Sequence, residues 1–407
     1  MRNAFDGWRI VAIAGMCQAL GFGLLSGYGF LVTPLAEEFG ASTAQLGFGF
    51  SISIMLSALV GPLLGRLLDT GPLRAIMLAG VVLMLLSMLL LSRGVTLTQL
   101  GLCFAVTSVG MSMYGPFPAQ VMIVNWFFRR RGTALAWAAV GLSVASFVVP
   151  QVTARLVAAF GWRVAVAAIA CGAALIALPP IALYAVKRPE DVGQHPDGVA
   201  PSGDAGGAPG LLEIPLARLV RDANFWLVGI GLSIALCVVL PTFFLVRYME
   251  RELGIPVVEA ANVPSTIAAC GLVGKLLGGW AMDRTDKRLV VAAALLLHAL
   301  GWLLVAMQKT LAGMLLAAVP LGLGGGGFLA LPAVLQAACF GRAMIGRVSG
   351  LHALIGLPFL LTIAPLVGWA EQRTGSFAQP FVGLAALLVA AAAVLVSVRF
   401  PKVEPGL

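Results

Sequence analysis

Residues 265–288 read STIAACGLVGKLLGGWAMDRTDKR, an apolar segment that carries one lysine and ends in a run of alternating charge. Lys275 is the one charged residue deep inside a segment long enough to cross a membrane. An ammonium group without a partner is costly in hydrocarbon, so intramembrane lysines usually face a polar cavity and mark the route of a substrate or an ion. The sequence therefore directs the search for function to Lys275.

The charged end of this stretch has a copy earlier in the chain. The segment GPLLGRLLDTGPLR places a glycine, an aspartate and an arginine at intervals of four and five, namely Gly65, Asp69 and Arg74. The same residue types recur with the same spacing as Gly279, Asp283 and Arg288. The two sets are thus separated by one constant difference in residue number, which relates 65 to 279, 69 to 283 and 74 to 288. We call this difference the repeat offset. Repeated halves are typical of secondary transporters, which bind their substrates near the bilayer midplane where the repeats meet.

The composition places the chain in a bilayer. With 60% hydrophobic and 11% charged residues, it has too little polar surface to cover a soluble globule of 407 residues. We count twelve apolar segments of about 20 residues or more, each long enough for a helix across a ~30 Å hydrocarbon core. They cover residues 9–33, 43–67, 74–93, 99–123, 132–158, 164–185, 224–247, 258–282, 289–308, 311–336, 345–369 and 377–399. The expected fold is an all-α membrane protein with two pseudo-symmetric bundles of six helices.

The duplication and a polar stretch predict the domain boundaries. Residues 187–222 are rich in Pro, Gly, Ala and Asp and bury little apolar surface, so they are expected to form a cytoplasmic linker. The two bundles are then residues 1–186 and 223–407. The apolar N-terminal stretch continues to Thr33 without a small-residue cleavage site, so we interpret it as the first helix rather than a signal peptide.

The charges predict an orientation instead of a nucleic-acid partner. The net charge is +9, but the basic residues are dispersed among short loops, the pattern that sets membrane topology. Placing both termini in the cytoplasm puts 18 of the 26 Lys and Arg residues on that side. Five of the six cysteines fall inside predicted spans, Cys339 lies just after one, and none has a paired spacing, so neither a disulfide framework, a metal site nor a cofactor is expected.

Five motifs along the chain carry a resemblance to a known family. They are the Gly65, Asp69 and Arg74 signature, WFFRRRGTALA at 126–136, DGW at 6–8, RPEDVG at 188–193 and FGRAMIGRVSG at 340–350. Together they resemble the major facilitator superfamily, and more narrowly bacterial members of its monocarboxylate and oxalate:formate branch, over essentially the whole chain. The resemblance implies a transporter whose helix eight carries a cation that meets the substrate carboxylate, and Lys275 occupies the matching position.

Small residues share a helix face with this lysine, among them Ala268, Gly271, Gly278 and Gly279. They either leave room for a ligand or serve close helix packing, which is the commoner role of small residues in membrane helices. An ammonium carries three donors on a compact charge, and a carboxylate both neutralises it and accepts its hydrogen bonds.

Four further residues are candidates for substrate binding. Tyr114 precedes Gly115-Pro116-Phe117-Pro118 in a helix that we expect to be broken, where its hydroxyl could donate to a carboxylate. His352 lies where the resemblance places a second cation in dicarboxylate exchangers. Gln18 and Tyr28 are the polar residues of the first helix. Each of the four has an ordinary packing role as its alternative, and we interpret His298 as structural and His195 as an unspecialised linker residue.

A separate set of charges is expected to form a cytoplasmic gate. It comprises Asp69, Arg74, Arg129, Arg130, Asp283 and Arg288. We expect Asp69 to meet the arginines at 129–131, and Asp283 to meet basic residues such as Arg342 and Arg347, in networks exchanged between outward-open and inward-open states. Topology anchoring accounts for the arginines equally well but explains the repeated aspartate less well.

The sequence departs from the resemblance in one respect. All 17 acidic residues map to loops or helix ends, and Gly271 stands where the animal lactate carriers of this family have an aspartate one turn before the cation. Proton coupling could instead run through His352, through a deprotonated Lys275, or not occur, because burial lowers the pKa of a lysine or a histidine.

These observations predict a monomeric carrier of small organic anions, most directly lactate, pyruvate or formate, with or without a proton, in a bacterial inner membrane. Proton-coupled efflux of drugs or metabolites is the first alternative, although a cationic substrate favours a membrane carboxylate. A sensor of the same fold that binds a ligand without moving it is the second. An enzyme is not expected, because the predicted core lacks paired acids, a nucleophile with its base and metal-ligand clusters.

Overall fold

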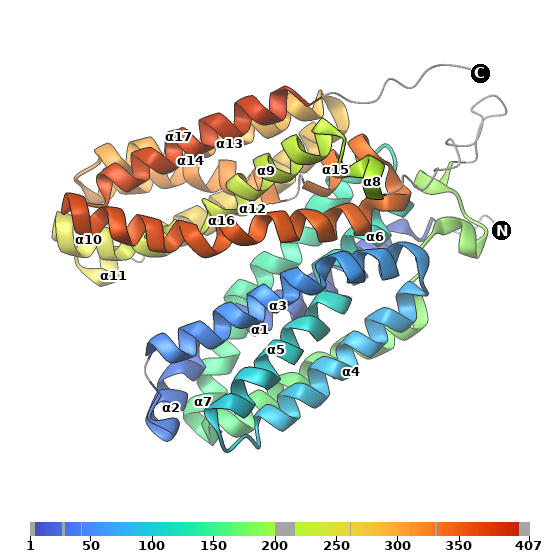
Figure 1. The fold of residues 1–407 in the computed structure, drawn as a ribbon, viewed down its shortest axis with the longest axis horizontal. Helices are drawn as coiled ribbons and strands as arrows, with labels where there is room; N and C mark the ends of the chain where they lie inside the picture. The colour runs from blue at the N-terminus through green and yellow to red at the C-terminus, as the bar shows by residue number, and fades with distance from the viewer. Residues whose placement is uncertain are drawn as a thin grey trace. The chain divides into compact units, whose positions relative to one another are not determined.

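The computed structural model of the protein describes residues 5–26, 29–41, 43–199, 216–260, 262–329 and 332–398. These residues fold into helices joined by short turns (Figure 1). The α-helices are α1 (Gly7–Ser26), α2 (Gly29–Phe39), α3 (Thr43–Thr70), α4 (Leu73–Leu91), α5 (Leu97–Tyr114), α6 (Pro116–Trp126), α7 (Arg131–Tyr184), α8 (Leu216–Leu219), α9 (Ala223–Cys237), α10 (Leu245–Leu253), α11 (Val257–Ala260), α12 (Asn262–Arg284), α13 (Lys287–Met307), α14 (Leu311–Leu329), α15 (Pro332–Phe340), α16 (Ile345–Thr374) and α17 (Ala378–Val396). Short 3₁₀ turns are η1 (Pro189–Val192), η2 (Pro196–Gly198), η3 (Leu240–Phe244) and η4 (Arg342–Met344).

Every predicted span falls on one of these helices or on a consecutive pair. α7 holds two spans, because Gly161 interrupts it with a φ of 76°, in the gap between the predicted segments 132–158 and 164–185. Among the described residues, eight helical stretches have the length and hydropathy needed to cross a membrane. Side chains such as Phe147 (77% exposed) and Leu175 (75% exposed) are apolar yet uncovered, as expected for surfaces that face lipid. The prediction of an all-α, multi-pass membrane protein is confirmed.

The predicted break in the fourth span is also confirmed. α5 ends at Tyr114, and Gly115 has a non-helical backbone with φ −83° and ψ −129°. α6 then begins at Pro116, which has no N–H to donate and therefore suits the first position of a helix. The glycine and proline thus leave Tyr114 at a helix end inside the membrane segment.

The internal duplication is visible in the helix boundaries. α4 and α13 begin one repeat offset apart, as do α5 and α14. α3 and α12 end one repeat offset apart, as do α6 and α15. The shift that the signature motifs predict therefore extends over most of each half.

The chain forms two compact units. Unit 1 comprises Met1–Arg129, Trp137–Leu211 and Arg342–Leu354, and unit 2 comprises Arg130–Ala136, Leu212–Gly341 and Ile355–Leu407. α7 and α16 each contribute residues to both units. The predicted division into bundles 1–186 and 223–407 stays a prediction.

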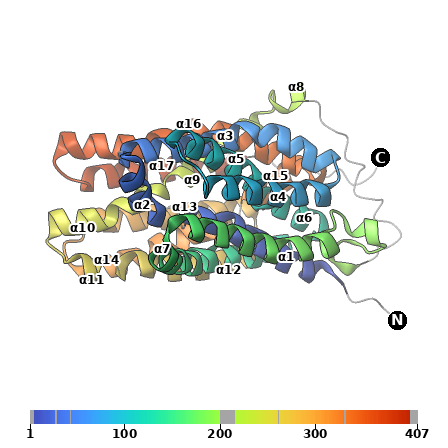
Figure 2. The same ribbon diagram turned by 90° about the horizontal axis from the view of Figure 1, so that it is seen from below.

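In unit 1, α5 packs against α3 and α4, and α1 packs against α6 (Figure 1). α4 and α5 are in close contact at Gly80 and Gly110, where a methyl group on either glycine would lie 2.8 Å from the carbonyl oxygen of the other. In unit 2, α14 packs against α12 and α13, and α17 packs against α13 and α9 (Figure 2). The rings of Trp302 and Phe381 join α13 to α17 with their centroids 4.9 Å apart.

Candidate functional site

Lys275 lies in the middle of α12 and is 6% exposed within the protein. Two glycines near it, Gly274 and Gly278, pack against α14, and Gly279 packs against Gly132 and Ala136 of α7. A methyl group on Gly278 would lie 3.1 Å from the Gly327 carbonyl oxygen, and one on Gly274 would overlap the Leu323 carbonyl. These glycines therefore serve close helix packing, the second of the two roles that their sequence pattern allows. The lysine is buried beside a tightly packed seam.

Tyr114 carries a buried hydroxyl group in unit 1. The side chain is fully buried at the end of α5, and its hydroxyl oxygen has no hydrogen-bond partner among the described residues. Buried polar groups are nearly always paired, and leaving one unsatisfied costs about 1–3 kcal/mol. This hydroxyl can therefore form a hydrogen bond with a ligand or a water molecule.

Two other predicted residues belong to the first helical span. Gln18 lies in α1 and is 6% exposed. α1 also approaches the helix break, because a methyl group on Gly21 would lie 3.3 Å from the Gly115 Cα atom. The structure thus brings Gln18 and Tyr114 into one region of unit 1. Tyr28 lies outside the described residues.

The three histidines have different surroundings. His352 lies in α16, within the part of that helix that belongs to unit 1, and is 5% exposed. His298 is buried in α13, with its Nδ1 atom 2.8 Å from the Leu321 carbonyl oxygen and its Nε2 atom accepting from the Trp302 indole at 3.3 Å. Both ring nitrogens of His298 are therefore satisfied by the fold, which confirms its structural interpretation. His195 is exposed and precedes η2.

Asp69, at the end of α3, binds the first turn of α16. Its Oδ1 accepts from the Gly346 amide at 2.9 Å and its Oδ2 from the Arg347 amide at 2.7 Å. The first amides of a helix lack partners within it and carry partial positive charge, so a carboxylate is a strong cap. The segment that Asp69 caps comes from the other half of the sequence.

Asp283, at the end of α12, makes the equivalent contact with α7. Its two carboxylate oxygens accept from the Gly132 amide at 2.6 Å and the Thr133 amide at 2.8 Å. Each donor lies one repeat offset before the corresponding donor to Asp69, so the repeat holds on both sides of the contact. The expected partners of the two aspartates are therefore wrong. Asp69 binds at 346–347 instead of at 129–131, and Asp283 binds at 132–133 instead of near 342 and 347. Both carboxylates accept from backbone amides and not from arginine side chains.

The two signature arginines have another role. The Arg74 Nε atom donates to the Ala185 carbonyl at 2.9 Å, and the Arg288 Nη1 atom donates to the Val398 carbonyl at 2.8 Å. Each arginine thus ties the start of α4 or α13 to the end of the last helix in its own sequence half. The bond of Arg74 lies within unit 1, and the bond of Arg288 lies within unit 2.

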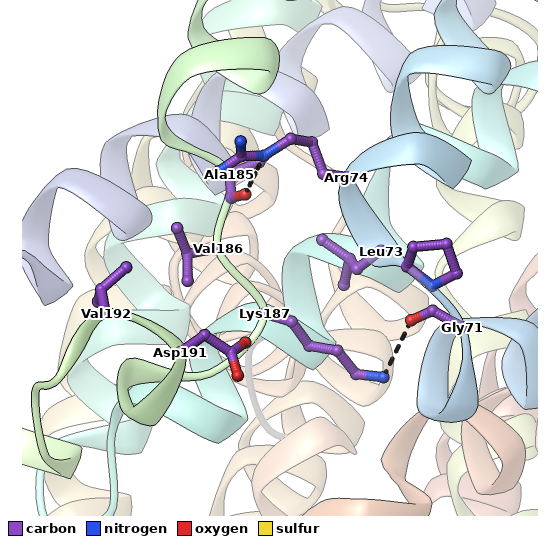
Figure 3. Close-up of a pocket in the computed structure, with 9 residues that line it drawn as sticks. Gly71, Leu73, Arg74, Ala185, Val186, Lys187, Asp191 and Val192 are labelled. Carbon is purple, nitrogen blue, oxygen red and sulfur yellow. Dashed lines mark hydrogen bonds between the residues drawn. The ribbon is translucent and has the colours of Figure 1, made fainter.

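The end of α7 and the start of α4 enclose a cavity of about 310 Å³, lined by residues 71–74, 185–187, 191 and 192. Figure 3 shows Arg74 reaching Ala185 and Lys187 reaching the Gly71 carbonyl, a 3.3 Å hydrogen bond. The Lys187 ammonium also donates to the Asp69 carbonyl. Main-chain carbonyls at helix ends thus accept from both cations, and the Asp191 carboxyl also interacts electrostatically with Lys187. The side chains that line this cavity therefore hold the end of α7 to the turn between α3 and α4.

The other predicted gate residues, Arg129 and Arg130, lie in the turn before α7 with exposed side chains. The amides of Phe128 and Arg129 donate to one Asp197 oxygen at 3.0 and 2.7 Å. Arg342 forms an ion pair with Glu190 at 3.0 Å. The first part of the expected linker, residues 187–199, is therefore an ordered segment held by side-chain contacts in unit 1.

Sequence reasoning missed one repeated pair of carboxylates. Glu38 and Glu252 stand one repeat offset apart, at the ends of α2 and α10, and each binds residues of its own sequence half. The offset of the signature motifs was the signal that could have found them.

Comparison with known proteins gives consistent similarities. The sequence profile of the Major Facilitator Superfamily matches residues 11–357. Monocarboxylate transporter 13 of Bos taurus is 27% identical over 415 residues, covering 96% of this chain and 89% of that protein. The MFS-type transporter pynF of Aspergillus niger is 26% identical, covering 86% of this chain and 76% of that protein. A solved structure of the proton:xylose symporter XylE bound to 6-bromo-6-deoxy-D-glucose has a TM-score of 0.76 at 14% identity, covering 97% and 95% of the two chains.

Proposed function

The chain belongs to the Major Facilitator Superfamily, and from that membership we propose that it transports small organic anions, most directly monocarboxylates of the lactate, pyruvate and formate class, by alternating access. The observation that carries the proposal is the burial of Lys275 inside a membrane-spanning helix. A single buried cation suits a monoanion, which balances its charge and accepts its hydrogen bonds.

Two further observations support this substrate class. The buried Tyr114 hydroxyl, unpaired among the described residues, is a donor that a ligand oxygen can use. A relative that aligns with nearly the whole chain is named a monocarboxylate transporter. Gln18, His352 and Tyr28 remain further candidates for substrate binding.

We propose that Asp69 and Asp283 act as the gate of the transport cycle. Each carboxylate holds the first turn of a helix from the other sequence half, so a change between outward-open and inward-open states has to release these bonds. Arg129 and Arg130 stay candidates for the exchanged contacts, whereas the bonds of Arg74 and Arg288 favour a role in holding each half together. A monomeric carrier with cytoplasmic termini, in a bacterial inner membrane, is part of this proposal, although the relatives named above come from an animal and a fungus.

The gate proposal has a pH dependence with a definite sign. Asp69 lies beyond the predicted span 43–67, and burial raises its pKa to about 6 against the opposing effect of its two amide bonds. When the contact opens and water reaches the carboxyl, its pKa falls back toward about 4. The closed contact therefore binds a proton more tightly, so lowering the pH from 7 to 5 favours it.

We expect hydrogen–deuterium exchange of residues 340–350, corrected for intrinsic rates, to slow as the pH falls over that range. Lys187 and Arg347 are the cations near Asp69, and neither residue type ordinarily titrates between pH 5 and pH 7. Asp69→Asn should remove the pH dependence. Faster corrected exchange at pH 5, or an unchanged profile in Asp69→Asn, would contradict the assignment.

Counterflow tests the transport proposal directly. Vesicles that contain the purified protein and are preloaded with unlabelled L-lactate should accumulate labelled L-lactate above the external concentration, and protein-free vesicles should not. A thermal-shift screen of C1 to C6 carboxylates identifies the best anion beforehand, since a ligand that binds only the folded state raises its stability. Saturable binding of the best anion without counterflow favours a sensor, whereas uptake of organic cations and no carboxylate binding favours efflux of drugs.

A further inference from the structure

Glu38 joins two distant parts of the first sequence half. Its carboxylate accepts from the Trp162 indole at 2.6 Å and from the Arg163 guanidinium. Arg163 also donates to the Gly94 carbonyl at 2.9 Å and stacks over the Trp162 ring at 4.4 Å. The contact therefore fixes the end of α2 to the corner where α7 changes direction.

Glu252 makes the same junction in the second half with different chemistry. Its carboxylate accepts from the Ser376 hydroxyl and from the Phe377 amide, the latter at 2.7 Å. Ser376 and Phe377 stand one repeat offset after Trp162 and Arg163. The position of the contact is thus repeated although its donors have changed.

The backbone around both junctions is repeated as well. Gly40 and Gly254 follow α2 and α10 with φ values of 60° and 66°. Gly161 and Gly375 form the two corners with φ values of 76° and 73°. All four occupy the left-handed region that favours glycine, and the members of each pair are one repeat offset apart.

The helices that these carboxylates hold are short. α2 has 11 residues and α10 has nine, and α10 follows the 3₁₀ turn η3 rather than continuing α9. Helices of this length have marginal stability by themselves, so their direction depends on what anchors them. Glu38 and Glu252 supply such an anchor at the far end of each helix.

The contacts of Glu38 and Glu252, which we call the ties, join different parts of the chain from those that the gate residues Asp69 and Asp283 join. Among the described residues, the partners of Glu38 lie in residues 1–186 and in unit 1, and those of Glu252 lie in residues 223–407 and in unit 2. Asp69 and Asp283 instead bind a helix start from the other sequence half. Alternating access moves one repeat against the other largely as rigid bodies, so contacts within a half persist while contacts across halves are exchanged.

We propose that Glu38 and Glu252 are positioning residues that stay bound throughout the transport cycle and make α2 and α10 move with their own halves. This rests on the proposed transport function. The hydrogen bond from Arg163 and then that from Trp162 hold the pKa of Glu38 below its usual range, so this tie stays ionised where Asp69 titrates.

Cross-linking separates a permanent tie from a gate. In a background without the six native cysteines, we would combine Glu38→Cys with Arg163→Cys, Glu252→Cys with Ser376→Cys and, as the reference, Asp69→Cys with Arg347→Cys. A short bifunctional thiol reagent then bridges each pair. Hydrogen exchange of residues 340–350 reports opening of the gate without any substrate, and L-lactate counterflow reports transport.

Bridging either glutamate pair should leave exchange and counterflow within about twofold of the unbridged protein, and bridging the reference pair should slow both at least about tenfold. Inhibition by the Glu38 or Glu252 bridge as strong as that by the reference bridge would overturn the proposal. If the unbridged protein shows no lactate counterflow, the proposed substrate is wrong. The hydrogen-exchange measurement still tests whether Glu38 and Glu252 stay bound, because it needs no substrate.

Single substitutions give a second test. Glu38→Gln should speed hydrogen exchange in residues 29–39 at least about threefold, and Glu38→Asp should restore part of the protection because it keeps the charge. Glu37→Gln changes the exposed neighbouring carboxylate and serves as the matched control. Equal effects of the substitutions at 37 and 38 would also overturn the proposal.

Discussion

Lys275→Ala is expected to reduce monocarboxylate uptake about 100-fold at limiting substrate, with the folded yield unchanged. The substitution removes the buried cation of α12 and with it the charge-assisted hydrogen bond that we propose it makes to the substrate. Such a bond contributes about 1.5–3 kcal/mol, and each 1.4 kcal/mol corresponds to tenfold in binding. Uptake of labelled L-lactate into vesicles at several concentrations measures the loss.

Two variants control for this result. Lys275→Arg should keep part of the activity, since the charge stays while the geometry of the donors changes. Lys309→Ala removes an exposed lysine between α13 and α14 and should transport normally. Unimpaired uptake by well-folded Lys275→Ala would refute the role of Lys275.

Gly326→Ala is expected to destabilise the folded protein strongly. The added Cβ would overlap the Gly271 carbonyl in the seam between α14 and α12. Both atoms are fixed by helical backbone, so the helices themselves must separate, at a cost of about 1–3 kcal/mol or more. A fall in the thermal unfolding midpoint of purified protein in detergent measures the effect.

Gly383→Ala is the matched control for that experiment. Gly383 lies in α17 of the same unit, and no atom lies within 4 Å of a methyl group built on it. An alanine in an open helical position stabilises by up to about 1 kcal/mol relative to glycine. A fall in the midpoint of Gly383→Ala equal to that of Gly326→Ala would show that steric overlap in the seam is not the cause.

Much of the fold could be predicted because its determinants are local. Apolar segments of membrane length locate the helices, and Gly115 followed by Pro116 locates the break beside Tyr114. The repeat offset, read from three signature residues, recurs in helix boundaries, in turn glycines and in the donors to Asp69 and Asp283. The internal repeat can be read from the sequence alone, without knowing which distant residues are in contact.

The partners of the carboxylates could not be predicted in the same way. Asp69 meets a residue 277 positions later, and charge pairing suggested arginine side chains where the structure uses the unsatisfied amides of a helix start. The glycines near Lys275 presented a similar choice, because small residues allow either a cavity or close packing, and only the position of α14 decides for packing. Glu38 and Glu252 lie outside the signature motifs, so a search confined to those motifs missed them.

The crossed hydrogen bonds of Asp69 and Asp283 also bear on how such a chain could have arisen. Residue 69 binds at 346, and its counterpart 283 binds at 132, which is the reciprocal exchange that two identical chains make about a two-fold axis. A single ancestral copy that formed a dimer would already have held both carboxylates and both helix starts. Fusion of two copies would preserve this reciprocal pair of contacts. Each half of the present chain therefore depends on a carboxylate from the other half to cap one of its helices.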